Sequence, residues 1–211
     1  MIFENREDAG RRLANQLQEF ANSNDVLVLG IPRGGVTVAF EIAKSLRAPL
    51  DVFLSHKLGV PGQEELAFGA IASGHPPFLE QHIIRSEAIT PRQVERVAAE
   101  VSRMLDRRAV LYRGDRPPIQ VAGRTVILVD DGIATGASMY AAVSALRQMN
   151  PASLIVAAPI APESTCAWLR TSVDRLVCLH TPHDFFSVGQ FYRSFAQVTD
   201  EEVIDRLRRA P

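Results

Sequence analysis

The 211-residue sequence contains few of the residues that indicate a disulfide framework, a membrane span or a nucleic-acid surface. Its two cysteines, Cys166 and Cys178, have no His or Cys partner at ligand spacing, which favours small core residues over a metal site. No apolar run approaches the roughly 18 residues of a membrane span. A formal net charge of −1 provides no global field to attract nucleic acid or an acidic membrane. We therefore expect neither as a partner.

Lysine is also scarce: it occurs only at Lys44 and Lys57, so arginine supplies most of the positive charge. No Gly-Lys-Ser or Gly-Lys-Thr occurs, which excludes a Walker A nucleotide loop. The opening residues M-I-F-E-N-R-E-D are polar and acidic, unlike a signal peptide, so we expect a cytoplasmic protein. The composition, 46% hydrophobic and 22% charged, is ordinary for a globular chain, and the length suits one domain over residues 1–211.

Short apolar runs alternate with segments of helical periodicity along the chain. This alternation predicts the α/β class, with a Rossmann-like, largely parallel sheet flanked by helices. Such sheets bind ligands beyond the carboxyl ends of their strands. The expected strands cover residues 26–29, 50–54, 66–72, 126–129, 153–159 and 175–179. The expected helices cover residues 6–21, 36–46, 90–112, 139–149, 162–170 and 199–209, with capping boxes at Thr90 and Thr199.

Three segments do not follow this alternation. Residues 56–65 carry two glycines and Pro61, which predicts a mobile loop. Residues 78–89 are compatible with one or two short strands. Residues 180–195 are rich in aromatic side chains and lack a regular period, which predicts an irregular segment.

The most informative run is V-I-L-V-D-D-G-I-A-T-G-A-S, residues 126–138. Four apolar residues end in Asp130 and Asp131, and a loop of small residues then leads into a helix. Backbone N–H groups, the helix dipole and the hydroxyls of Thr135 and Ser138 can together hold a phosphate. The two carboxylates suit sugar hydroxyls or a hydrated Mg²⁺. The alternative is an ordinary buried strand that ends in an Asp-Asp-Gly turn.

A second loop of the same kind, G-I-P-R-G-G, covers residues 30–35 between a predicted strand and a predicted helix. Exposed N–H groups, a rigid proline and the fixed charge of Arg33 are suited to a pyrophosphate. Taken alone, this loop is equally well explained as a tight turn. Its presence beside the first motif provides two separate anion sites in one chain.

The two motifs resemble the phosphoribosyl pyrophosphate (PRPP) signature of the type I phosphoribosyltransferases. The resemblance implies the type I fold with a small hood, and Mg²⁺ as cofactor, bound mostly through substrate oxygens and water near Asp130 and Asp131. It implies that these two aspartates hold the ribose hydroxyls and that Arg33, Gly34 and Gly35 hold the pyrophosphate. The 5′-phosphate is then expected at Ala134, Thr135, Gly136, Ala137 and Ser138.

The segment from His56 to Gly69 resembles the flexible loop of the adenine-type members, which closes over the reacting centre and excludes water. The resemblance implies that Lys57 binds pyrophosphate charge, together with Arg33. Glu65 or Glu64 is the candidate for the base. A solvated lysine and exposed loop carboxylates remain the alternatives. The 6-oxopurine members carry an acidic residue where this chain has Ala134, which disfavours a hypoxanthine–guanine specificity.

The acceptor pocket of this family lies under the hood, whose expected sources are residues 1–25, 78–90 and 180–195. The last of these contains F-F-S-V-G-Q-F-Y, residues 185–192, which resembles a segment of an uncharacterised bacterial subgroup that also has the Pro-Arg-Gly-Gly loop. We expect Phe185, Phe186 and Val188 to contact the acceptor base. The alternative is that these side chains form the hood core.

The resemblance implies a Mg²⁺-dependent transfer of ribose 5-phosphate from PRPP to a small heterocyclic acceptor, with release of pyrophosphate. The alternative is a non-catalytic regulatory protein of the same fold that senses PRPP or a nucleotide. A first strand near Val26 leaves little room for an N-terminal DNA-binding module. A generic α/β protein with a receiver-like Asp pair is a third interpretation, which the Thr-Gly-x-Ser loop disfavours. Relatives are often dimers, so a homodimer is expected, with helix 90–112 as a candidate interface.

Overall fold

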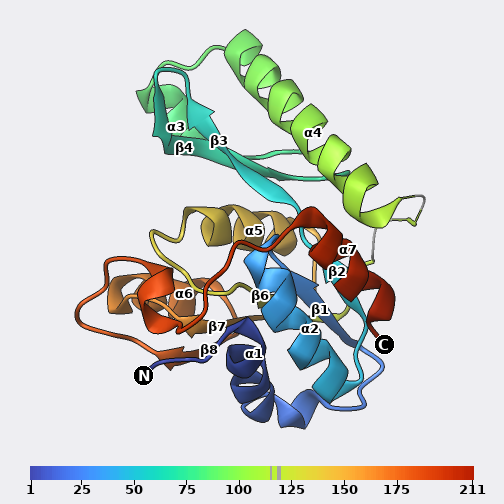
Figure 1. Ribbon diagram of the computed structural model, residues 1–211. Coiled ribbons are helices and arrows are strands. Elements are labelled where there is room, and N and C mark those ends of the chain that lie inside the picture. The colour runs from blue at the N-terminus through green and yellow to red at the C-terminus, as the bar shows by residue number, and fades with distance from the viewer. Residues whose placement is uncertain (115, 118–119) are drawn as a thin grey trace. The chain divides into compact units, whose positions relative to one another are not determined.

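A computed structural model describes residues 1–114, 116–117 and 120–211. The chain divides into two compact units. The first contains Met1–Phe53, Ile119–Gly136 and Asn150–Pro211, and the second contains Leu54–Pro118 and Ala137–Met149. The predicted single domain over residues 1–211 therefore contains two compact units (Figure 1).

The first unit is built on a parallel sheet of five strands in the order β2-β1-β6-β7-β8. All five residues of β1 are buried, as expected for a parallel strand covered on both faces. This architecture confirms the predicted α/β class. The strands are β1 (Val26–Gly30), β2 (Leu50–Val52), β6 (Thr125–Val129), β7 (Ser153–Ile160) and β8 (Arg175–His180).

Four α-helices belong to the same unit as this sheet, and the last of them begins where its capping residue predicts. Thr199 and Glu202 form the expected capping box at the last helix. The first helix is shorter than predicted, because after Asn15 the amides of Gln16 and Leu17 bond to carbonyls three residues back. The elements are α1 (Arg6–Asn15), α2 (Gly34–Leu46), α6 (Glu163–Ser172) and α7 (Asp200–Arg209), with the 3₁₀ helices η1 (Gln18–Phe20) and η2 (Val188–Phe191).

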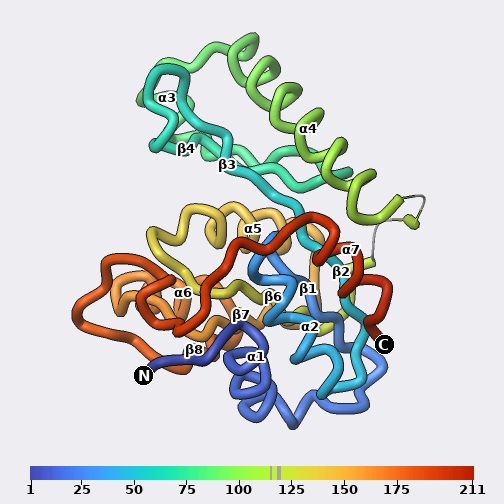
Figure 2. Tube along the Cα trace, in the orientation of Figure 1, coloured from blue at the N-terminus to red at the C-terminus, as the bar shows by residue number. Residues whose placement is uncertain are grey.

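The N-terminal segment and residues 180–195 pack against each other in the first unit (Figure 2). Phe3 and Tyr192 form an isolated parallel bridge, and both side chains are buried in one apolar cluster. Two of the three predicted hood segments thus lie together. Residues 78–90 belong to the second unit. The hood itself stays a prediction.

The second unit has an antiparallel sheet in the order β3-β4-β5, which α4 and α5 contact. The expected strand at residues 66–72 belongs to this sheet and not to the parallel one. Thr90 and Gln93 form the predicted capping box. The elements are β3 (Ser55–Val60), β4 (Gln63–Ala72), β5 (Phe78–Leu79), α3 (Gln81–Ser86), α4 (Pro91–Arg113) and α5 (Ala137–Gln148).

The prediction of an irregular mobile loop at residues 56–65 is wrong in its secondary structure. These residues form most of the β3–β4 hairpin. Leu58 and Val60 alternate into the core, and Pro61 and Gly62 form the turn, in which Gly62 has a φ of +84°. The glycines and the proline therefore mark a turn and a register shift between two paired strands. In the part of the chain that the structure describes, no helix has an apolar stretch that could cross a membrane.

Candidate functional site

The two predicted anion loops meet because their strands are neighbours. Gly30 of β1 lies opposite Val129 of β6 in parallel register, so the chain leaves both strands at the same edge of the sheet. A Cβ atom on Gly35 would lie 2.8 Å from the carbonyl oxygen of Val129 and 2.9 Å from Cα of Asp130. A Cβ atom on Gly34 would overlap Oδ2 of Asp131. Glycine is required here because the carboxylate strand approaches the loop this closely.

Arg6 is the residue of this site that sequence reasoning missed. Its Nε atom donates to Oδ2 of Asp131 at 2.6 Å, and the two side chains are only 11% and 15% exposed. Nη1 donates to the carbonyl oxygen of Ala196 at 2.7 Å, and the guanidinium lies 3.8 Å from the centre of the Phe195 ring. Arg6 and Asp131 are 125 positions apart, so no local spacing could have paired them.

Tyr192, the last residue of the run F-F-S-V-G-Q-F-Y, holds the backbone of the same aspartate. Its hydroxyl donates to the carbonyl oxygen of Asp131 at 2.6 Å. Burial and the negative charge of Asp131 raise the pKa of Tyr192, so the phenol remains a donor at neutral pH. The sequence analysis included Tyr192 only as the last residue of the run F-F-S-V-G-Q-F-Y and gave it no role of its own.

Asp130 and Asp131 differ in their electrostatic surroundings. Burial of its carboxyl group and the like charge of Asp131 raise the pKa of Asp130 well above its ordinary value. The amide of Asp131 donates to Oδ1 of Asp130 at 2.9 Å and opposes this shift. Asp131, in contrast, has the Arg6 cation within hydrogen-bond distance.

The predicted 5′-phosphate loop leads directly into α5. Ala134, Thr135 and Ser138 are exposed, and Gly136 has a φ of +79°, a conformation that favours glycine. Thr165 of α6 supports the loop within the first unit, since its hydroxyl donates to the carbonyl oxygen of Ala134 at 3.2 Å. The open loop therefore precedes a helix N-terminus, as an anion site of this kind requires.

The lysine and the carboxylate predicted to act together are in contact in the second unit. Nζ of Lys57 lies 2.9 Å from Oε2 of Glu65, and the Glu65 side chain is 98% exposed. Glu64 lies on the same hairpin and borders a neighbouring cleft. In the first unit, Arg33 takes the N-cap position of α2 and is partly exposed. Of these predicted residues, Lys57 and Glu65 are thus in contact in the second unit, whereas Arg33 belongs to the first unit.

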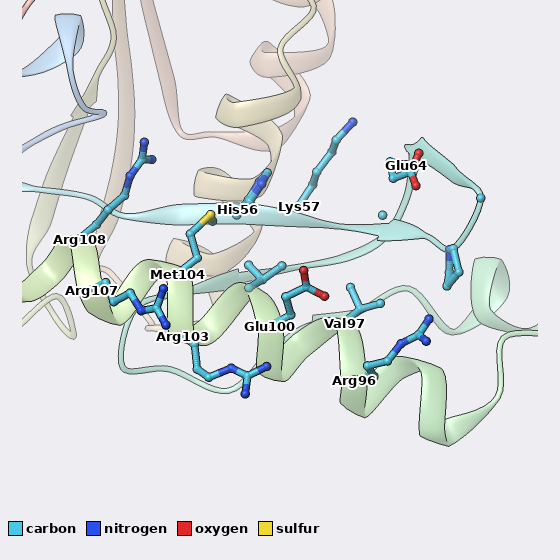
Figure 3. A pocket seen from close by; sticks show the side chains of 14 residues that line it. His56, Lys57, Glu64, Arg96, Val97, Glu100, Arg103, Met104, Arg107 and Arg108 are labelled. Carbon is cyan, nitrogen blue, oxygen red and sulfur yellow. The ribbon is translucent and has the colours of Figure 1, made fainter.

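The cleft bordered by Lys57 has a volume of about 1050 Å³ and lies between β3, its hairpin turn and α4 (Figure 3). Burial, Lys57 and Arg108 lower the pKa of His56. Sequence reasoning did not single out the arginines of α4, since they occur on a polar helix face. The ionisable residues that line the cleft are His56, Lys57, Glu64, Arg96, Glu100, Arg103, Arg107 and Arg108.

The three residues expected to contact an acceptor base have different surroundings. Phe185 stacks on Phe191 with ring centres 5.8 Å apart, at the edge of the apolar cluster. Val188 packs so closely on Gly132 that a Cβ atom there would overlap it. Phe186 is 90% exposed. Their contact with an acceptor stays a prediction.

The chemistry of the aspartate pair fits Mg²⁺, which takes oxygen ligands and usually binds through one or two carboxylates, water and substrate phosphates. Asp130 and Asp131 supply such oxygens beside the Gly34–Gly35 loop. Among the residues that the structure describes, no three or more His, Cys, Asp or Glu side chains form a metal-binding group. A site completed by substrate and water needs no such group.

The phosphoribosyl transferase domain family matches residues 1–192 of this chain. The chain belongs to this family, which confirms the resemblance at the level of the family. Two curated relatives from Mycobacterium tuberculosis, strains CDC 1551 / Oshkosh and ATCC 25618 / H37Rv, are each 45% identical over 209 residues. Both relatives are named as putative phosphoribosyl transferases. The match covers 99% of this chain and 47% of each relative, so this chain spans about half of their length.

The chain is also similar to a solved structure over almost its whole length. The crystal structure of TT1426 from Thermus thermophilus is 42% identical in sequence, with a TM-score of 0.90. The match covers 98% of this chain and 98% of TT1426. The similarity therefore extends over both compact units.

Proposed function

We propose that this chain is a Mg²⁺-dependent phosphoribosyltransferase, which moves ribose 5-phosphate from PRPP to a nitrogen of a nucleobase-like acceptor. The observation that carries this proposal is the close approach of the Gly34–Gly35 loop to Asp130 and Asp131. PRPP carries its pyrophosphate on C1, beside the ribose hydroxyls. A glycine loop for the pyrophosphate next to two carboxylates for the hydroxyls matches this arrangement.

In the proposed reaction, the bond from C1 to the pyrophosphate oxygen breaks and a bond from C1 to the acceptor nitrogen forms. Negative charge gathers on the departing pyrophosphate, where Arg33 and the amides of Gly34 and Gly35 stabilise it. Asp130 and Asp131 orient the ribose through its hydroxyls. When bound, Mg²⁺ supplies further neutralisation of the pyrophosphate charge.

The proposal keeps the roles that the sequence predicts for the hairpin residues. Lys57 binds pyrophosphate charge, and Glu65 accepts the proton that the acceptor nitrogen loses, with Glu64 as the second candidate. The exposure of Glu65 supports a role in binding a ligand from solvent. Phe186 offers an exposed ring for a flat acceptor. Ala134 disfavours a 6-oxopurine, so adenine is the first acceptor to test.

The first test is incubation of the protein with PRPP, Mg²⁺ and a panel of bases, followed by measurement of released pyrophosphate. We expect release with at least one base. PRPP binding without release from any base would instead support the non-catalytic sensor, in which the fold and the loops serve recognition alone.

A variant test addresses PRPP binding itself. Asp130→Ala combined with Asp131→Ala should abolish PRPP binding, measured by calorimetry, while the far-ultraviolet circular dichroism stays unchanged. Asp25→Ala combined with Asp205→Ala is the matched control, because it removes the same charge from two exposed positions. Undiminished PRPP affinity in the first variant would contradict the proposed function.

A further inference from the structure

The N-terminal segment and the run of residues 185–192 meet at one of the two site aspartates. Arg6 of the N-terminal segment bonds to the carboxylate of Asp131, and Tyr192 of the C-terminal segment bonds to its carbonyl oxygen. Val188 packs on the following residue, Gly132, and Phe195 lies against the Arg6 guanidinium. The aspartate is therefore held at its side chain, at its backbone and at the next residue by segments that are distant from it in the sequence.

We propose that Arg6 is a positioning residue for PRPP, which orients the Asp131 carboxylate toward one of the ribose hydroxyls, and that Tyr192 supports this orientation from the backbone side. This inference rests on the proposed function. It gives the aromatic segment, residues 185–192, a role that does not depend on contact with an acceptor.

The geometry explains why an arginine suits this position. The rigid guanidinium bonds to two acceptors in different directions, with Nε toward Asp131 and Nη1 toward Ala196. Its face lies 3.8 Å from the centre of the Phe195 ring, which fixes the plane of the group. A lysine at this position would keep the charge but could not reproduce these directions.

The contact is compatible with a bound sugar. An ionised carboxylate has about four sites for hydrogen-bond donors, so the bond from Nε to Oδ2 leaves capacity for a ribose hydroxyl. Arg6 also lies next to the pyrophosphate loop, since a Cβ atom on Gly34 would be 2.8 Å from its Nε. The Arg6 cation therefore lies beside both the pyrophosphate loop and Asp131.

The simpler explanation is that the ion pair only fastens the N-terminal segment to the sheet. The two explanations differ in what the loss of Arg6 does to recognition of the sugar. A loosened fold weakens binding of PRPP and of any analogue alike. A misplaced Asp131 weakens the binding of PRPP selectively, because an analogue without the hydroxyl that this aspartate binds does not make the affected hydrogen bond.

The experiment measures, by calorimetry in the presence of Mg²⁺, the affinities of the full chain for PRPP and for its 2′-deoxy and 3′-deoxy analogues. For Arg6→Gln we expect PRPP affinity to fall about tenfold or more, with a much smaller fall for one of the two analogues. Arg6→Lys and Tyr192→Phe should show the same selective loss to a smaller extent. Arg12→Gln is the matched control, because Arg12 lies on the same helix and pairs with Asp8 at the surface.

A double-mutant cycle completes the test. In an Asp131→Asn background, Arg6→Gln should change PRPP affinity less than twofold, since the carboxylate that it positions is gone. Equal losses for PRPP and both analogues, or unchanged PRPP affinity in Arg6→Gln, would overturn the inference. If Arg6→Gln does not fold, Arg6→Lys and Tyr192→Phe decide by the same criterion. Failure of the unmodified chain to bind PRPP would instead reject the proposed function.

Discussion

Gly34→Ala is the smallest change that should damage the proposed PRPP site. The added methyl group would overlap Oδ2 of Asp131 and lie 2.6 Å from its Cγ and 2.8 Å from Nε of Arg6. Asp131 cannot simply turn away, because Arg6 and the Tyr192 contact hold its side chain and its carbonyl group. The methyl group must therefore displace the carboxylate or the glycine loop.

The expected effect on stability is modest. Inserting a methyl group into a tightly packed site costs about 1–3 kcal/mol. Replacing glycine by alanine in a helix recovers up to about 1 kcal/mol, and Gly34 is the first residue of α2. The free energy of unfolding should therefore fall by no more than about 3 kcal/mol.

The effect on PRPP should be larger. A displaced Asp131 loses a charged hydrogen bond to the ribose, which contributes about 1.5–3 kcal/mol. This corresponds to a fall in affinity of about 10- to 100-fold. Calorimetric titration with PRPP and Mg²⁺ measures the affinity, and urea denaturation measures the free energy of unfolding.

Gly123→Ala is a stability control for this experiment. Gly123 has a φ of +73°, and a Cβ atom there would have no other atom within 4 Å, so alanine is strained without contacting another residue. The strain should cost about 1–2 kcal/mol and leave PRPP affinity unchanged. A Gly34→Ala variant that folds and binds PRPP within twofold of the unmodified chain would refute the reasoning.

Three further predictions concern ionisation. Because folding raises the pKa of Asp130, the folded state holds more protons than the unfolded one above about pH 4, so the free energy of unfolding should decline as the pH rises from there. Asp130→Asn should flatten that decline, measured by urea denaturation in the presence of EDTA. An unchanged slope would contradict the raised pKa of Asp130. Arg108→Gln should raise the pKa of His56 in an NMR titration, since one repelling cation is gone. An unaltered pKa would show that Arg108 does not contribute to the shift. Burial and a hydrogen bond to Glu80 raise the pKa of Tyr140 to about 12. Glu80→Gln should therefore lower the pKa of Tyr140 in an ultraviolet titration. An unchanged pKa would show that Glu80 does not contribute to the shift.

The features that sequence alone predicted correctly depend on neighbours along the chain. The capping boxes at Thr90 and Thr199 bond a side chain to an amide three residues on, so both helix starts follow from local spacing. The buried strands beginning at Val26 and Thr125 follow from apolar runs bounded by polar residues. The order of these elements was enough to predict the α/β sheet, whereas the ligand site at its carboxyl edge stays a prediction.

The hairpin at residues 56–65 shows where prediction of secondary structure from the local sequence failed. Pro61 and Gly62 suggested a loop, yet the flanking residues pair as strands because Leu58 and Val60 are buried. Whether such a segment pairs depends on what its apolar side chains can pack against. In this unit they pack in a core that also includes residues after position 136, which the sequence order does not reveal.

By itself, the sequence determined the chemistry of the site: two adjacent carboxylates after one buried strand and a glycine-rich loop after another. Tertiary structure alone decided that these strands are neighbours in register, that Gly34 lies against Asp131, and that Arg6 holds that carboxylate. The physical reason is that hydrogen-bonding groups and backbone freedom belong to individual residues, whereas distance and burial arise only when segments far apart in the chain pack together.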